Sequence, residues 1–200
     1  VQAWCLPPET PDKLCAQLAI AGNAFERSLS LTEQVRCSRL FVDHHSDEVD
    51  ARAAAREVGL PPNEKLLHQL SQLADAPEPL WQAMKTGAVQ LPMALELCKR
   101  PLDEAAALAD LFLTLRPNLN RQRELVGYLD DISRRDDLSV DQVLDDAKHT
   151  ADSHNPDIER PRRLARLRDT LRQCRYPRLV EAERGRARLL AELRLGDQLQ

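Results

Sequence analysis

The sequence has few aromatic residues, few glycines and no long hydrophobic run. Aromatic residues make up 4% of the 200 residues, and glycine occurs six times. Strands favour aromatic and β-branched residues, whereas the leucine, alanine, arginine and glutamate that dominate here favour helices. No apolar stretch approaches the roughly 20 residues that a membrane-spanning helix needs. We therefore expect a soluble, all-α protein with no membrane partner.

Cysteine is present but is not arranged for cross-linking. The five cysteines form no CxxC pair and lie far apart, at Cys5, Cys15, Cys37, Cys98 and Cys174. An odd, scattered set argues against both a disulfide framework and a zinc site. Free thiols in a reducing compartment explain it more simply, so we expect a cytoplasmic protein.

Catalytic and metal-binding patterns are also missing. No Ser/His/Asp or Cys/His arrangement can be assigned, and the glycines are too scattered for a loop that cradles phosphate. His44, His45 and Asp47 have the right composition for a metal site, but adjacent histidines point to different faces of a helix. We expect no enzyme activity, no metal and no cofactor.

The net charge of −4 is distributed unevenly along the chain. Residues 158–195 contain twelve arginines and five acidic residues, a local balance of +7, which leaves −11 for the remainder. A basic segment on an acidic body is typical of a surface for phosphate or for an acidic partner, and equally of a solvated helical face. Composition leaves both interpretations open.

The N-terminal residues predict the end of a preceding domain. Residues 1–6 alternate in bulk as a strand does before two prolines stop them. A single strand is not stable alone, and the chain starts at Val1 rather than at methionine. We therefore expect residues 1–22 to be the remnant of an upstream domain.

The rest of the chain predicts helices separated by proline and polar breaks. A multi-helix domain is expected over residues 23–151, the best linker over 152–161, and a basic helical segment over 158–200. Within that basic segment, Arg-rich amphipathic helices are expected over 161–174 and 177–195. Other helices are predicted at about 12–21, 31–44, 80–86, 92–99, 101–115, 118–135 and 139–149.

Residues 46–73 are predicted to form two short helices joined by a tight turn. Gly59 can adopt the left-handed conformation that ends a helix, and Pro61 and Pro62 cannot continue it. Asn63 can cap the second helix, which has apolar residues at 3–4 spacing: Leu66, Leu67, Leu70, Leu73 and Ala74. This is the outline of a helix-turn-helix; two ordinary core helices are the alternative.

If this segment binds DNA, its second helix enters the major groove with its first residues leading. The predicted DNA-binding residues are Asn63, Lys65, His68, Gln69, Arg52, Arg56 and Lys85. We expect the first two near bases, the next two along the groove wall, and the last three at phosphates. For each of them, an ordinary solvated side chain is the alternative.

Four segments follow one another in an ordered series. Residues 23–34 contain an Asn and an Arg before a leucine, a helix cap and a glutamate; residues 54–59 read AAREVG. Residues 77–94 contain Gly87 followed by Ala94, and residues 119–126 read LNRQRELV. Over about 23–130, the set resembles the junction motif, helix-turn-helix, following segment and closing helix of ParB-like partition proteins.

The resemblance implies the DNA-binding module of a chromosome or plasmid partition protein of ParB/RepB type. Such proteins act as homodimers on double-stranded DNA at a centromere-like site, which implies association with the nucleoid. The resemblance also implies that residues 1–22 are the remnant of an upstream nucleotide-binding domain. In the family that domain binds CTP and closes into a sliding clamp, but its nucleotide motifs are absent from this sequence. The family's recognition helix starts with small hydroxyl and arginine residues, whereas residues 61–65 here read PPNEK. A helical protein-interaction or dimerisation scaffold with degenerate DNA readout is therefore the alternative function.

Overall fold

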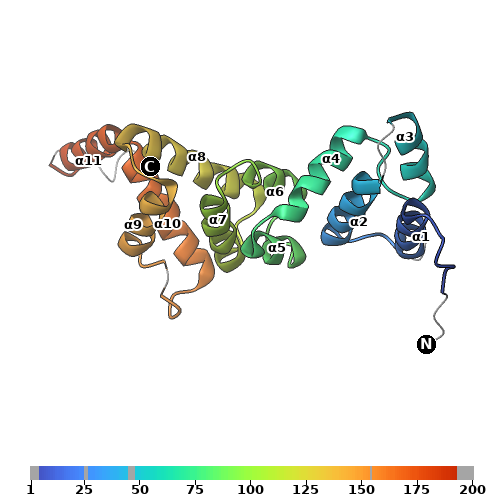
Figure 1. Cartoon of the computed structure of the whole chain (residues 1–200). Helices are drawn as coiled ribbons and strands as arrows, with labels where there is room; N and C mark the ends of the chain where they lie inside the picture. Colours follow the sequence, from blue (N-terminus) through green and yellow to red (C-terminus); the bar gives the residue numbers. More distant parts are fainter. Residues whose placement is uncertain (1–4, 25–26, 45–47, 154, 193–200) are drawn as a thin grey trace. The chain divides into compact units, whose positions relative to one another are not determined.

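The structure is a computed structural model that describes residues 5–24, 27–44, 48–153 and 155–192 (Figure 1). The side chains of residues 48–52 and 192 also lie outside the description. Across the described residues the chain forms α-helices and one short 3₁₀ turn, with no strand, so the all-α expectation is confirmed. Residues 5 and 6 of the expected strand have no strand structure, and its residues 1–4 are not described.

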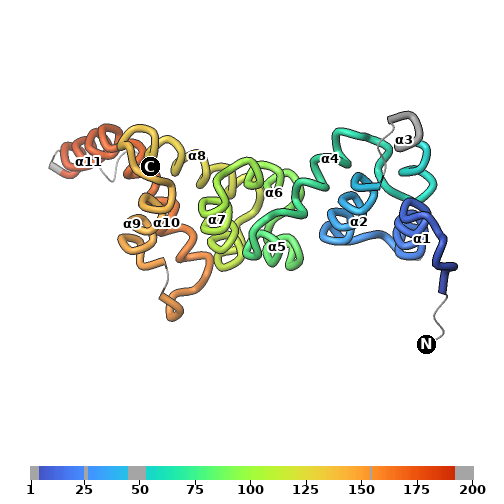
Figure 2. Tube along the Cα trace, in the orientation of Figure 1, coloured from blue at the N-terminus to red at the C-terminus, as the bar shows by residue number. Residues whose placement is uncertain are grey.

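The chain divides into two compact units, Val1–Arg116 and Pro117–Gln200, and Figure 2 traces the chain through each of them. The expected boundaries near residue 22 and at 152–161 do not coincide with this division. The helix that begins at Asp12 packs within the first unit, and the helix that begins at Leu119 packs with the Arg-rich helices in the second.

The first unit is built from seven α-helices among its described residues. They are α1 Asp12–Ala24, α2 Leu31–His44, α3 Glu48–Glu57, α4 Glu64–Gln72, α5 Glu78–Lys85, α6 Leu91–Leu97 and α7 Leu102–Leu115, with the 3₁₀ turn η1 at Leu73–Asp75 after α4. Helix α2 packs mainly against α4, and α5 packs mainly against α7. Buried leucines and Phe112 fill the space around α5 and α7.

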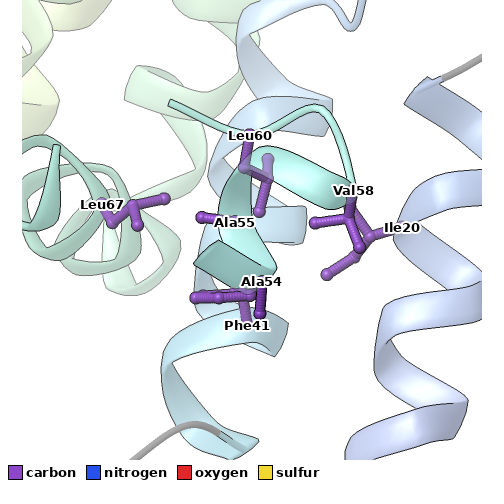
Figure 3. Packing of buried hydrophobic residues seen from close by; sticks show 7 residues of the cluster. All are labelled: Ile20, Phe41, Ala54, Ala55, Val58, Leu60 and Leu67. Carbon is purple, nitrogen blue, oxygen red and sulfur yellow. The ribbon is translucent and has the colours of Figure 1, made fainter. Parts of the chain in front are cut away.

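One hydrophobic cluster holds α1 to α4 together (Figure 3). Its buried members are Ile20, Phe41, Ala54, Ala55, Val58, Leu60 and Leu67. Phe41 is the largest of them and is almost completely buried, and Ala55 is fully buried. Because Ala54 and Ala55 lack long side chains, α3 can lie close to its neighbours.

The second unit contains α8 Leu119–Asp136, α9 Val140–Thr150, α10 Arg160–Arg175 and α11 Pro177–Glu192. Local signals define the starts of the first two. The Asn118 side chain accepts a hydrogen bond from the backbone of Arg121, and Ser139 and Gln142 form a reciprocal capping box. Both caps lie at the starts of helices that the sequence predicts, at about residues 118 and 139.

Glu124 fastens α10 to α8. Its Oε1 accepts hydrogen bonds from Arg168 Nε at 2.9 Å and from the Tyr128 hydroxyl at 2.8 Å, and its Oε2 accepts one from Arg121 at 2.5 Å. Partial burial raises the pKa of Glu124, but these three hydrogen bonds outweigh it and lower the pKa from 4.5 to about 2. The carboxylate is therefore ionised wherever the unit is folded at ordinary pH.

A second contact between α8 and α10 surrounds Arg175. Its guanidinium forms an ion pair with Asp131 and lies 5.1 Å from the ring centre of Tyr128 and 4.7 Å from that of Tyr176. Cation–π contacts of this kind stabilise a guanidinium that is partly removed from water. Together with the buried Leu167 and Leu171 of α10, they make α10 part of the second unit's core.

Candidate nucleic-acid interface

The turn between α3 and α4 has the geometry of a Schellman helix end. Gly59 has φ of +76°, its N–H donates to the Arg56 carbonyl at 3.2 Å, and the Leu60 N–H donates to the Ala55 carbonyl at 2.8 Å. These are the two backbone bonds that define the motif. Leu60, the residue that follows the glycine, is buried in the cluster beneath. The predicted sharp turn at Gly59 is confirmed.

Helix α4 is capped at its start by Asn63. The Asn63 Oδ1 accepts a hydrogen bond from the Leu66 N–H at 3.2 Å, while the residue itself has extended backbone angles. Glu64 follows in the first turn, where the helix dipole favours a negative charge. The direction of α4 is therefore fixed by a turn, two prolines and a cap within five residues.

One side of α4 is buried and the other is open to solvent. Leu67 and Leu70 are buried, and α2 is the main helix that covers them. Lys65 and His68 are exposed, and Gln69 is half-buried. A helix anchored along one side holds its opposite side in a defined position, which readout of base edges requires.

The predicted DNA-binding residues fall into two groups. Asn63, Lys65, His68 and Gln69 share the first two turns of α4 or its cap, and the His68 ring lies 4.0 Å from the Glu64 carboxylate. Arg56 is exposed at the end of α3, and Lys85 is exposed in the last turn of α5. The seventh, Arg52, lies on α3 among the residues whose side chains are not described.

The charge around this face is close to balanced. Arg56 and Lys65 are offset by Glu57 and Glu64. This face therefore offers little net charge for electrostatic attraction, and its exposed polar groups are donors and acceptors of directional hydrogen bonds.

The segment before α2 contains hydrogen bonds and an ion pair among residues that the sequence indicates only as part of a motif. Ser30 and Glu33 cap each other's backbone, and Arg27 forms a two-point ion pair with Glu33. The hydrogen bonds from Arg27 and Ser30 hold the pKa of Glu33 well below its usual range. The Ser-x-x-Glu spacing is the signal that predicts this cap.

A cavity of about 470 Å³ opens between this segment and the turn at Gly59. Its lining residues are Ala24, Ser28, Leu29, Gln34, Gly59, Leu60 and Pro61. Gln34 donates a hydrogen bond to the Leu29 carbonyl at 2.9 Å. No sequence pattern pointed to this cavity, because its walls come from two stretches of the chain, residues 24–34 and 59–61, that are 25 positions apart at their nearest.

Other site types have little support in the described part of the chain. No group of three or more His, Cys, Asp or Glu side chains is gathered there as for a metal ion; His45 and Asp47 are not described. The five cysteines are free thiols, and burial raises the pKa of Cys37 and Cys98. None of the described helices has the length and apolar character to cross a membrane.

Comparison with known proteins adds no relative. No protein-family model, no curated protein and no solved structure matches the chain.

Proposed function

We propose that this chain is the DNA-binding module of a ParB-like chromosome or plasmid partition protein, with α4 as its recognition helix. The observation that carries the proposal is the combination of the Schellman turn at Gly59, the cap at Asn63 and the exposed side of α4. The ordered sequence resemblance over about 23–130 names the family. The proposed protein is cytoplasmic, associates with the nucleoid and needs no cofactor or catalytic residue of its own.

Base readout would use the exposed polar atoms of α4. Lys65 carries donors suited to guanine O6 and N7, and Gln69 has the paired donor and acceptor that match adenine. Asn63 uses its oxygen as the helix cap, which leaves its amide nitrogen able to donate. Arg56, and with it Arg52 and Lys85, would hold phosphates and set the register of the helix.

A homodimer would double this contact. Two copies of α4 related by a two-fold axis would read half-sites about 34–36 Å apart or a multiple of that spacing. The expected DNA site is therefore an inverted repeat.

The experiment is selection of bound sequences from a random duplex pool, followed by affinity measurement on the enriched duplex. We expect an inverted repeat to be enriched, and Lys65→Glu to weaken its binding by about 5- to 150-fold, the range for loss of one specific base contact. Lys99→Glu is the matched control, because Lys99 is exposed, lies in the same unit and is not among the proposed DNA-binding residues. A pool with no enriched sequence, or equal loss in both variants, contradicts the proposal.

A helical interaction scaffold is the second candidate function. The observation in its favour is that α11 exposes two large apolar side chains, Leu179 at 47% and Leu189 at 59%. Sedimentation velocity of the wild type and of Leu179→Gln/Leu189→Gln tests it. A dimer that dissociates in the variant supports the scaffold, and an unchanged sedimentation coefficient contradicts it. Deleting α10 and α11 is a poorer test, because Leu167 and Leu171 are buried in the unit's core.

A further inference from the structure

Ten of the eleven arginines of α10 and α11 divide into those with a carboxylate partner and exposed ones without; the eleventh, Arg163, is half-buried. Arg168 pairs with Glu124, Arg172 with Glu183 and Arg175 with Asp131. Seven others are exposed and have no carboxylate partner among the described residues: Arg160, Arg162, Arg166, Arg178, Arg184, Arg186 and Arg188. The paired arginines fasten helices together, so only the second set is free to bind a partner.

Helix α11 carries four of these seven arginines and contributes little to the core. None of its described side chains is buried, and all of those from residue 181 to residue 189 are exposed. The acidic residues of α11 whose side chains are described are Glu181 and Glu183, both exposed, and Glu183 pairs with Arg172 of α10. Arg184 and Arg188 are one turn apart on the same side, where like charges destabilise a helix, so their positions are not explained by helix stability.

We propose that the exposed arginines of α11 bind the phosphodiester backbone of nucleic acid without regard to sequence. Residues 158–195 contain twelve arginines and no lysine. The planar guanidinium matches phosphate in a bidentate geometry, which the ammonium of lysine cannot do. Arginines on successive turns suit a polymer that repeats its anionic group at regular intervals.

The apolar residues of α11 favour nucleic acid over a lipid surface. Leu179, Ala182, Arg186 and Leu189 follow one another at three- and four-residue steps and so share one side of the helix. Inserting that side into the apolar boundary of a bilayer would bury the guanidinium of Arg186, which is costly without a partner. Self-pairing of α11 along the same side meets the same obstacle.

This binding does not depend on α4. The proposed surface lies in the second unit and recognises charge, whereas α4 lies in the first unit and would recognise base edges. The selection experiment measures which duplex sequence is enriched by binding. Salt dependence is instead measured on a duplex of random sequence, so either proposal can fail while the other holds.

The test is fluorescence anisotropy of the whole chain with a random-sequence 30-base-pair DNA duplex, from about 50 to 200 mM salt, the range over which phosphate contacts weaken steeply. In Arg184→Gln/Arg188→Gln, we expect the slope of log affinity against log salt to become less steep by about 2, one for each lost phosphate contact. Binding at about 100 mM salt should weaken by at least about tenfold on the same counterion-release relation. Far-ultraviolet circular dichroism confirms that the variant is folded.

The matched control is Arg134→Gln/Lys99→Gln, which removes the same charge at exposed positions outside α10 and α11. Its slope should equal that of the wild type. Equal slopes in all three proteins overturn the proposal, as does wild-type binding to phosphatidylserine vesicles or to polyglutamate that is tighter than binding to the duplex. Equal or tighter binding to single-stranded RNA supports it, because RNA has the same phosphodiester group.

Discussion

Helices α4 and α11 both carry an exposed polar side, but they are held in different ways. A Schellman turn and an asparagine cap fix the start of α4, and Leu67 and Leu70 bury its inner side. Helix α11 has no buried side chain among its described residues, and the Arg172–Glu183 ion pair joins it to α10.

The difference in anchoring decides what each helix can recognise. Reading a base edge requires side chains held close to one productive geometry, and an anchored helix such as α4 can provide that. Attracting a phosphate backbone requires only charge at the surface, because the electrostatic term does not depend on sequence. This difference is why we propose sequence readout for α4 and sequence-independent affinity for α11.

The largest expected effect is on the anchor of α4. Leu70→Ala should lower the free energy of unfolding of the first unit by about 2–5 kcal/mol, because Leu70 is fully buried and its truncation leaves a cavity. Urea unfolding followed by tryptophan fluorescence measures it, since both tryptophans, Trp4 and Trp81, belong to the first unit. A loss below about 1 kcal/mol, far under the usual cost of such a cavity, would contradict the anchoring described for α4.

Glycine to alanine substitutions should have opposite effects on the free energy of unfolding in the two regions. Gly59→Ala should destabilise the first unit by about 1–2 kcal/mol, the cost of a left-handed conformation for a residue with a Cβ. That Cβ would also lie 3.1 Å from the Cβ of Ala24. Gly185→Ala is the control, because it is inside α11 and its Cβ would meet nothing within 4 Å. It should stabilise α11 by about 0.5–1 kcal/mol, and destabilisation there would show that α11 packs more closely than described.

Glu124→Gln tests the attachment of α10, from which α11 extends. At pH 7 the variant should lower the free energy of unfolding of the second unit by about 1 kcal/mol through weakened charged hydrogen bonds. Since the folded-state pKa of Glu124 is about 2, below its ordinary value of 4.5, its contribution is complete above pH 4.5 and is lost as the pH falls towards 2.

The measurement is unfolding at several pH values, followed by tyrosine fluorescence, because Tyr128 and Tyr176 are the two tyrosines and both are in the second unit. The wild type should lose stability from pH 5 to pH 2 more steeply than the variant. Parallel curves would mean that Glu124 does not hold α10.

The smallest effect is expected on α11. Leu189→Ala should change the free energy of unfolding by less than about 0.5 kcal/mol, because its side chain is 59% exposed and removing it creates no cavity. The same unfolding experiment measures it. A loss comparable to that of Leu70→Ala would show that α11 is covered, by a second copy of the chain if the loss grows with protein concentration.

Local features of this fold were predictable from sequence. The turn glycine, the Asn63, Asn118 and Ser139 caps and the proline breaks act within a few residues, so the helix bounds follow from their neighbours. The observed α2 has the predicted bounds of residues 31–44. The side of α4 that carries Lys65 and His68 was also predictable from the spacing of its leucines.

Features that depend on distant residues were not predictable. Leu167 of α10 and Leu189 of α11 lie in similar amphipathic patterns, yet one is buried and the other exposed, because burial depends on which helices lie nearby. Glu124 and Arg168 are 44 residues apart, and no spacing rule pairs them. The division into two compact units at 116/117 depends on such distant contacts as well.

The most direct test of the division of roles is one selection from a random duplex pool with three proteins: the wild type, Lys65→Glu and Arg184→Gln/Arg188→Gln. The account predicts that the wild type and the α11 variant enrich the same sequence, the α11 variant with weaker affinity, and that Lys65→Glu binds this sequence about 5- to 150-fold more weakly and loses the preference at the base pair that Lys65 contacts. An unchanged preference at every base pair in Lys65→Glu, or a changed sequence in the α11 variant, would contradict it.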